Sequence, residues 1–171
     1  VSISYNHKPE FPKLYDKYFG KGETTSELTP NFTWYNSNDP DGELHTYNLE
    51  VSTEANFVNP MVITGIEEDK SLGYSYSWTT PTLTEGYYFF RVKCFDDLSE
   101  SPYSEIWDFY IDTTPPAPVT DLVAITGDAP GEIKLYWTST GDDGTLGAIT
   151  NGKIHVKYKE KENFLNWYSS N

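Results

Sequence analysis

The stretch that most constrains the fold is LTEGYYFFRVKCF, residues 83–95. In its second half the charged side chains of Arg91 and Lys93 alternate with apolar ones. Because successive side chains of a β-strand point to opposite faces, this period of two predicts a strand over residues 88–95 with one buried face. The buried face would carry Tyr88, Phe90, Val92 and Cys94.

Turn residues separate six other short segments with the composition of strands. They cover residues 9–14, 30–35, 45–53, 61–64, 73–79 and 106–111. Gly20 and Gly22 mark a turn after the first of them, and no segment has the apolar spacing of a three-turn helix. Seven short strands separated by turns predict an all-β fold, an antiparallel β-sandwich.

One pattern occurs twice: a strand that ends in Trp, an acidic turn with glycine, and a second alternating strand. The first copy has Trp34, the turn 38–42 and the strand 45–51, and the second has Trp137, the turn 141–144 and the strand 154–158. A repeat of this length predicts two related β-domains in tandem. The prolines of DTTPPAP, residues 112–118, cannot continue a sheet ladder. We therefore place the domains at residues 1–113 and 114–171.

The second domain has few predicted strands. They lie at residues 119–126, 132–138 and 153–159, and the aromatic segment 164–168 is left unassigned. A sandwich needs about seven strands. The segment 114–171 is therefore interpreted as the N-terminal part of an incomplete second module.

These motifs resemble the fibronectin type III family, in the form found in large secreted bacterial proteins. Trp34 and Trp137 are similar to the family's core tryptophan, and the alternating strands 47–51 and 154–158 are similar to its third strand. The segment 83–94 resembles its tyrosine-corner motif. The resemblance implies that the Tyr88 hydroxyl bonds back to upstream backbone. It also implies tandem fibronectin type III sandwiches, the second incomplete.

The charge of the chain narrows the range of functions. Among 171 residues there are 12 Lys and Arg and 26 Asp and Glu, so the net charge is −14. Residues 1–113 carry 7 basic and 19 acidic side chains, a net charge of 7 − 19 = −12. A surface this acidic repels phosphate backbones, so nucleic acid is not an expected partner. Membrane insertion is not expected either, since no apolar run is long enough to span a bilayer. Cys94 is the only cysteine, which rules out a disulfide within the chain.

Acidic loops are the first candidate site. In the predicted fold the loops after the second, fourth and sixth strands share one pole, and they contain nine carboxylates. These are Asp39, Asp41, Glu43, Glu67, Glu68, Asp69, Asp96, Asp97 and Glu100. Calcium prefers such oxygen ligands, so Asp39, Asp41, Asp96 and Asp97 are candidate calcium ligands. The alternative is a solvated cap that keeps the protein soluble.

Exposed aromatic rings are the second candidate. One group is Tyr15, Tyr18 and Phe19, and the other is Tyr87, Phe89 and Phe95. Such rings could stack on sugars, or they could pack within the sandwich or against a neighbouring domain.

The sequence offers no candidate for catalysis. The three histidines, His7, His45 and His155, are scattered, and we expect each at the surface rather than in a catalytic or zinc constellation. Cys94 lies on an apolar face and is expected to be a buried small side chain rather than a nucleophile.

The sequence as a whole predicts a non-catalytic module rather than an enzyme, located outside the cell or at the cell surface. It would be a spacer or interaction segment of a larger secreted bacterial protein, with neighbouring domains of the same parent chain as partners. Edge strands or pole loops would supply any contacts. The alternative is a carbohydrate-binding or calcium-dependent adhesion module, whose partner would be a polysaccharide or a cell-surface protein. No cofactor other than Ca²⁺ is implied.

Overall fold

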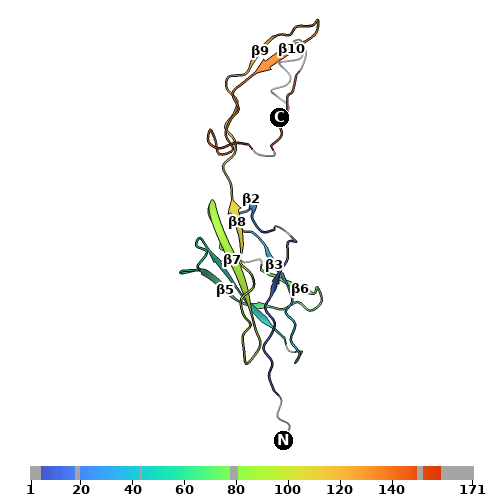
Figure 1. Ribbon diagram of the computed structural model, residues 1–171, viewed down its shortest axis with the longest axis vertical. Coiled ribbons are helices and arrows are strands. Elements are labelled where there is room, and N and C mark those ends of the chain that lie inside the picture. The colour runs from blue at the N-terminus through green and yellow to red at the C-terminus, as the bar shows by residue number, and fades with distance from the viewer. Residues whose placement is uncertain (1–4, 18–19, 43, 78–80, 150–151, 159–171) are drawn as a thin grey trace. The chain divides into compact units, whose positions relative to one another are not determined.

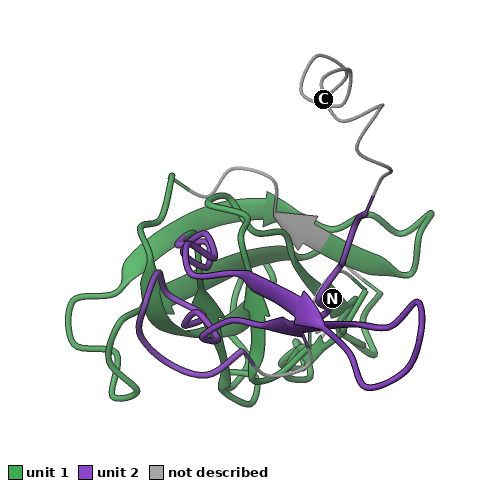
Figure 2. Ribbon diagram, turned by 90° about the horizontal axis from the view of Figure 1, so that it is seen from above, with its two compact units in different colours: residues 1–113 green, residues 114–171 purple. Residues whose placement is uncertain are grey.

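The computed structural model describes residues 5–17, 20–42, 44–77, 81–149 and 152–158. The chain divides into two compact units, residues 1–113 and residues 114–171 (Figure 2). Each unit is described by itself.

Unit 1 contains eight strands in its described residues, arranged as two sheets (Figure 1). The strands are β1 (Lys13–Leu14), β2 (Glu23–Thr25), β3 (Phe32–Tyr35), β4 (Thr46–Ser52), β5 (Met61–Glu67), β6 (Tyr74–Ser77), β7 (Gly86–Phe95) and β8 (Trp107–Ile111). One sheet has the order β1-β3-β6 and the other the order β2-β8-β7-β4-β5. All pairs are antiparallel except β2 with β8, which is parallel. The predicted antiparallel sandwich is confirmed.

The core of unit 1 lies between these two sheets. It contains Leu14, Phe32, Trp34, Tyr47, Leu49, Val51, Leu83, Tyr88, Phe90, Val92, Cys94, Phe109 and Ile111. In β7 buried residues alternate with half-buried ones, as the sequence predicted. Rings cross the interface between the sheets: the centroid of Phe32 is 4.6 Å from that of Phe90, and Trp34 lies 5.4 Å from Tyr47. Full burial of several rings supplies the largest stabilising term, since each Phe-sized side chain contributes roughly 1.5–3 kcal/mol.

The predicted tyrosine corner is present at the start of β7. The Tyr88 hydroxyl donates to the Thr84 carbonyl oxygen at 3.1 Å and accepts from the Thr84 amide at 3.3 Å. Gly86, between them, has a φ of 149°, which suits glycine. The backbone of this segment is also tied to the chain before β3, since the Leu83 amide donates to the Leu28 carbonyl at 2.8 Å.

Three strands of unit 1 differ most from the prediction, and the other boundaries shift by one or two residues where both ends are described. The first strand covers only Lys13–Leu14 instead of residues 9–14, because Pro9 and Pro12 have no amide proton for a ladder. β2 was not predicted, because its side chains are largely exposed and give no alternation. Its backbone holds it to β8 through bonds such as Gly22 amide to Asp108 carbonyl, 2.7 Å. β5 continues to Glu67 rather than ending at Thr64, because a bulge at Gly65 carries it past the glycine.

Unit 2 has one hairpin in its described residues, β9 (Val123–Thr126) with β10 (Ile133–Tyr136). The Glu132 carboxylate closes the turn by accepting from the amides of Asp128 and Ala129 at 2.9 and 3.0 Å. Residues 153–158 form no strand, so the predicted strand 153–159 is wrong over that range. Residues 159 and 164–168 lie outside the described part of the chain.

The apolar side chains of unit 2 are not buried as the sequence analysis expected. Trp34 is 0% exposed, but Trp137 is only half-buried. Ile154 and Val156 are 67% and 56% exposed. Across residues 114–149 and 152–158 no apolar side chain is buried. The interpretation of unit 2 as an incomplete second module stays a prediction.

The described residues form no helix, so they hold no apolar helix of membrane-spanning length.

Candidate functional site

The acidic loops of unit 1 meet at one pole. Two bonds join them there: Lys70 donates to the Gly42 carbonyl at 3.2 Å, and the Asn36 amide group donates to the Asp69 carbonyl at 2.9 Å. Asp41 lies close enough to Asp96 for the two carboxylates to repel each other. Of the predicted ligands, Asp39 is buried, Asp96 is half-buried, and Asp41 and Asp97 are exposed. Glu43 lies outside the described residues.

Two of these carboxylates already have several hydrogen-bond donors. Asp96 accepts from the Leu98 amide at 2.7 Å, the Ser99 hydroxyl at 2.7 Å and the Asn6 side chain at 3.2 Å, and also from the Ser99 amide. Desolvation opposes ionisation of Asp96, but the bonds from Ser99, Leu98 and Asn6 outweigh it and lower the pKa of this carboxyl. These bonds fold the loop after β7 around a carboxylate.

Asp41 is bound in a similar way by the N-terminal segment. The His7 amide donates to it at 2.6 Å, and the His7 ring nitrogen Nδ1 lies 3.0 Å from its Oδ1. The His7 amide bond, followed by the ring contact, lowers the pKa of Asp41. The pole loops therefore fasten the N-terminal segment to the sandwich.

A buried cluster that the sequence analysis missed lies beneath these loops. The His45 ring nitrogen Nε2 is 3.6 Å from Asp39 Oδ2, and Nδ1 is 3.5 Å from Glu68 Oε2. The three side chains are 3%, 0% and 4% exposed. The expectation that His45 lies at the surface is wrong. The signal was its position directly before β4, two residues ahead of the buried Tyr47.

The two carboxylates face opposite sides of the His45 ring, so this cluster does not converge on one point. Within the described part of the chain, no group of three or more His, Cys, Asp or Glu side chains is arranged to hold a metal ion. An ion bound through Asp41 or Asp96 would compete with the donors described above. The calcium site stays a prediction.

Aromatic rings gather on the outer face of the five-stranded sheet. Tyr87 is 48% exposed, and its ring centroid is 5.3 Å from that of Phe89 and 6.5 Å from that of Tyr110. The Tyr87 hydroxyl donates to Asp108, and this bond raises the pKa of the phenol. Phe95, at the far end of β7, is not part of this group. Tyr110 and Asp108 were missed because β8 shows weaker alternation.

A second aromatic group lies on the three-stranded sheet. The Tyr15 ring stacks on Tyr35 with centroids 4.8 Å apart and lies 5.9 Å from Tyr74. The predicted neighbours Tyr18 and Phe19 lie outside the described residues. Of the two other histidines, His7 is at the surface as described above, and His155 is exposed in unit 2.

Cys94 is buried among the core residues of the sandwich, as expected. Burial raises the pKa of its thiol to about 11. A protonated thiol is a weak nucleophile, so this side chain acts as packing.

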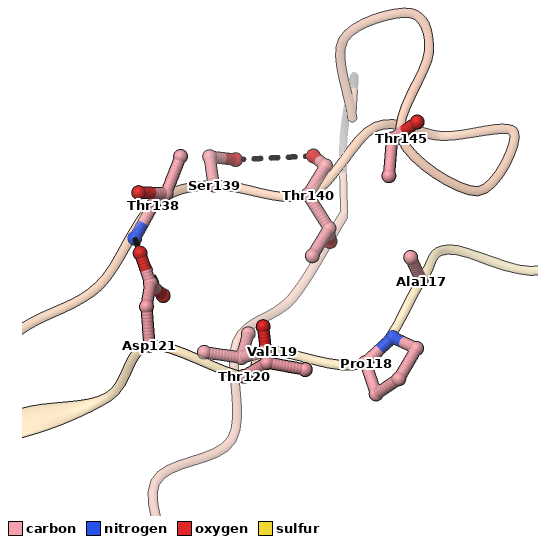
Figure 3. Close-up of a pocket in the computed structure, with 9 residues that line it drawn as sticks. All are labelled: Ala117, Pro118, Val119, Thr120, Asp121, Thr138, Ser139, Thr140 and Thr145. Atoms are coloured by element: carbon pink, nitrogen blue, oxygen red, sulfur yellow. Dashed lines mark hydrogen bonds between the residues drawn. The ribbon is translucent and has the colours of Figure 1, made fainter.

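Unit 2 contains a shallow hollow of about 290 Å³ whose lining includes several hydroxyl-bearing side chains (Figure 3). Thr120, Thr138, Ser139, Thr140 and Thr145 supply those groups. The Asp121 carboxylate accepts from the Thr138 amide, with both oxygens at 3.0 Å. This bond joins the segment before β9 to the segment after β10, so Asp121 has a structural role in the hollow.

No family model and no curated protein matches the chain. Similar solved structures are fibronectin type III domains. They include the FN1–FN3 domains of chicken CNTN1, with 16% identity, a TM-score of 0.41 and coverage of 77% of this chain. The chain spans 42% of the length of that protein. An Fn3-like protein from Clostridium thermocellum has 17% identity and a TM-score of 0.37, with 62% of this chain and 96% of that chain covered. A domain of human fibronectin type III domain containing protein 3 has 16% identity and a TM-score of 0.33. The match covers 65% of this chain and 90% of that chain.

The fold of unit 1 is an antiparallel β-sandwich of fibronectin type III type. Its own features carry that assignment: the two sheets, the buried Trp34 on β3, and the tyrosine corner that begins β7.

Proposed function

We propose that this chain is a non-catalytic spacer and interaction segment of a larger extracellular or cell-surface protein. The observation that carries the proposal is that the chain enters and leaves unit 1 at opposite poles. The resemblance of the motifs to modules of secreted bacterial proteins supports the extracellular setting.

The two poles are separated by the length of β7. At one end, Asn6 donates to Asp96, which directly follows the last residue of β7. At the other end, the Thr113 hydroxyl donates to Glu85 at 2.7 Å, and Glu85 directly precedes the first residue of β7. β7 has 10 residues. At about 3.3 Å per residue, unit 1 sets its two ends roughly 30 Å apart.

This spacing is held by rigid contacts. The N-terminal segment is fastened by Asp41 and Asp96, and the exit is fastened to Glu85. Between them lies a core packed across two sheets, which deforms little under load. A parent protein could use such a segment to hold its other domains at a set distance.

The spacing can be measured directly by electron–electron distance spectroscopy on spin labels. The labels would be placed at Lys8→Cys and Thr24→Cys in a Cys94→Ala background, since Thr24 is exposed and pairs with Tyr110 near the exit from unit 1. We expect a single narrow distance distribution on the order of 30 Å. Labels at Lys8→Cys and Leu98→Cys, both at the N-terminal pole, should give a much shorter distance. A broad distribution for the first pair would contradict the spacer role.

The rings on β7 and β8 favour a second candidate function, carbohydrate binding. Tyr87, Phe89 and Tyr110 offer ring surface beside the Asp108 carboxylate, a combination that suits sugar rings and hydroxyl groups. Affinity electrophoresis against about twenty polysaccharides tests it. Carbohydrate binding would be supported if one polysaccharide retards the chain, Tyr87→Ala abolishes that retardation and Phe11→Ala does not. Uniform lack of retardation would leave the spacer role alone.

A further inference from the structure

β5 is the long free edge of unit 1. It ends the order β2-β8-β7-β4-β5 (Figure 1), and among the described residues β4 is its one pairing partner. It has 7 residues, whereas the other outermost strands, β1, β2 and β6, have 2, 3 and 4. An unpaired edge of this length presents a row of amide and carbonyl groups to which another extended segment can bond.

The edge carries few of the features that usually block such pairing. Residues 61–66 contain no charged side chain and no proline, and Glu67 is the first charge. Within the described residues, the backbone–backbone bonds outside the ladders include none made by residues 61–67. One protective feature is present, a bulge in which Thr64 and Gly65 together face Asn48. The regular part of the edge is therefore Met61 to Thr64.

The side chains of β5 fix its position. Met61, Ile63 and Ile66 pack against the core, while Val62 points outward and is 47% exposed. A shift of the β4–β5 pairing by one residue would expose the packed side chains and bury the outward ones. The register of β5 is therefore already fixed in the absence of a partner. Docking on this edge needs no rearrangement of the sandwich.

Charge decides which partner fits. Glu67 ends the strand and Asp69 lies two residues further on, whereas Glu68 is buried against His45. Glu54 follows the end of β4. Residues 1–113 carry a net charge of −12, so two copies of this unit repel each other. A positively charged segment is attracted instead, and long-range attraction raises its association rate.

We infer that the outer edge of β5 binds an extended, basic segment of a partner protein, which adds a strand to the five-stranded sheet. The inference rests on the proposed interaction role and names the partner's chemistry. Backbone bonds to residues 61–64 supply affinity, and Lys or Arg side chains facing the carboxylates supply selectivity.

The test uses the 171-residue chain and three fluorescent eight-residue peptides. One alternates Lys with Val, one alternates Lys with Pro, and one alternates Glu with Val. The Lys–Pro peptide has the charge of the first, but its prolines lack an amide proton, so it offers only half as many backbone donors. We expect the Lys–Val peptide to bind at low salt, and the other two to bind at least about tenfold more weakly.

Two variants locate the site. Val62→Lys places a like charge on the edge and should weaken Lys–Val binding about tenfold, whereas Val62→Thr should leave it unchanged. Amide exchange of residues 61–64 should slow in the complex. Three results would overturn the inference. They are equal binding of the Lys–Val and Lys–Pro peptides, no binding of the Lys–Val peptide, and an affinity for the Lys–Val peptide that Val62→Lys leaves unchanged. Self-association of the chain through β5 would overturn it in favour of a second copy. None of these results alters the spin-label distance, so the spacer role is judged separately.

Discussion

The Tyr88 hydroxyl gives the residue-scale test of the fold. Tyr88→Phe removes the bonds to Thr84 without changing the packed ring. We expect the free energy of unfolding to fall by about 1–3 kcal/mol, because the Thr84 backbone loses a partner. Urea denaturation measures this change. Tyr35→Phe is the matched control, since that ring is 48% exposed on the outer face of β3. If both substitutions lowered the free energy of unfolding equally, the tyrosine corner would have no special role in stability.

His45 carries the second prediction at this scale. His45→Ala leaves Asp39 and Glu68 buried without the ring that faces both. Loss of the ring opens a cavity and leaves buried polar atoms without their neighbour, which costs about 1–3 kcal/mol, so this variant should be destabilised. The control is His7→Ala, whose side chain is 51% exposed. Thermal unfolding that is unchanged by His45→Ala would show that the cluster contributes nothing to stability.

At the scale of the element, Gly65 sets the bulge that ends the regular edge of β5. Its φ is 69°, and nothing lies within 4 Å of where a Cβ would be added. Gly65→Ala therefore tests backbone conformation alone and should cost about 1–2 kcal/mol. Thr64→Ala, the neighbouring position in the same bulge, is the control and should have a small effect. Chemical denaturation that ranks the two variants in the opposite order would contradict this account of the bulge.

The loops of the acidic pole carry the calcium prediction. If calcium binds there, millimolar calcium raises Tm, and Asp97→Asn removes that shift without changing the calcium-free Tm. Asp97 is the suitable position because it is exposed and, within the described residues, has no assigned hydrogen bond. Asp96→Asn would also disturb the loop that its carboxylate folds. A Tm independent of calcium in the unsubstituted chain would end the hypothesis.

Strands in which apolar and polar side chains alternate strongly could be predicted from the sequence. A strand held only by backbone hydrogen bonds could not. β7, β4 and β3 followed from the spacing of residues such as Phe90, Leu49 and Trp34, because burial of alternate side chains is written in the sequence. β2 was missed because its pairing with β8 depends on backbone groups. The pole loops were placed together correctly. The buried His45 was missed because it depends on Asp39 and Glu68, which are far apart in sequence.

At the scale of the whole molecule, the two units differ in what can stabilise them. Among the described residues, the buried core belongs to unit 1, and unit 2 buries no apolar side chain. Amide exchange should therefore be slow in β7 and fast in β9 and β10, because protection against exchange follows buried contacts. Hydrogen-exchange mass spectrometry on the intact chain measures both in one experiment. Two substitutions provide matched controls. The Ile133 side chain is 69% exposed, so Ile133→Asp should leave the unfolding transition unchanged. The Val92 side chain is 0% exposed, so Val92→Asp should abolish the transition. Protection in β9 and β10 equal to that in β7 would mean that unit 2 has a buried core of its own, and unit 1 would no longer be the sole source of cooperative stability.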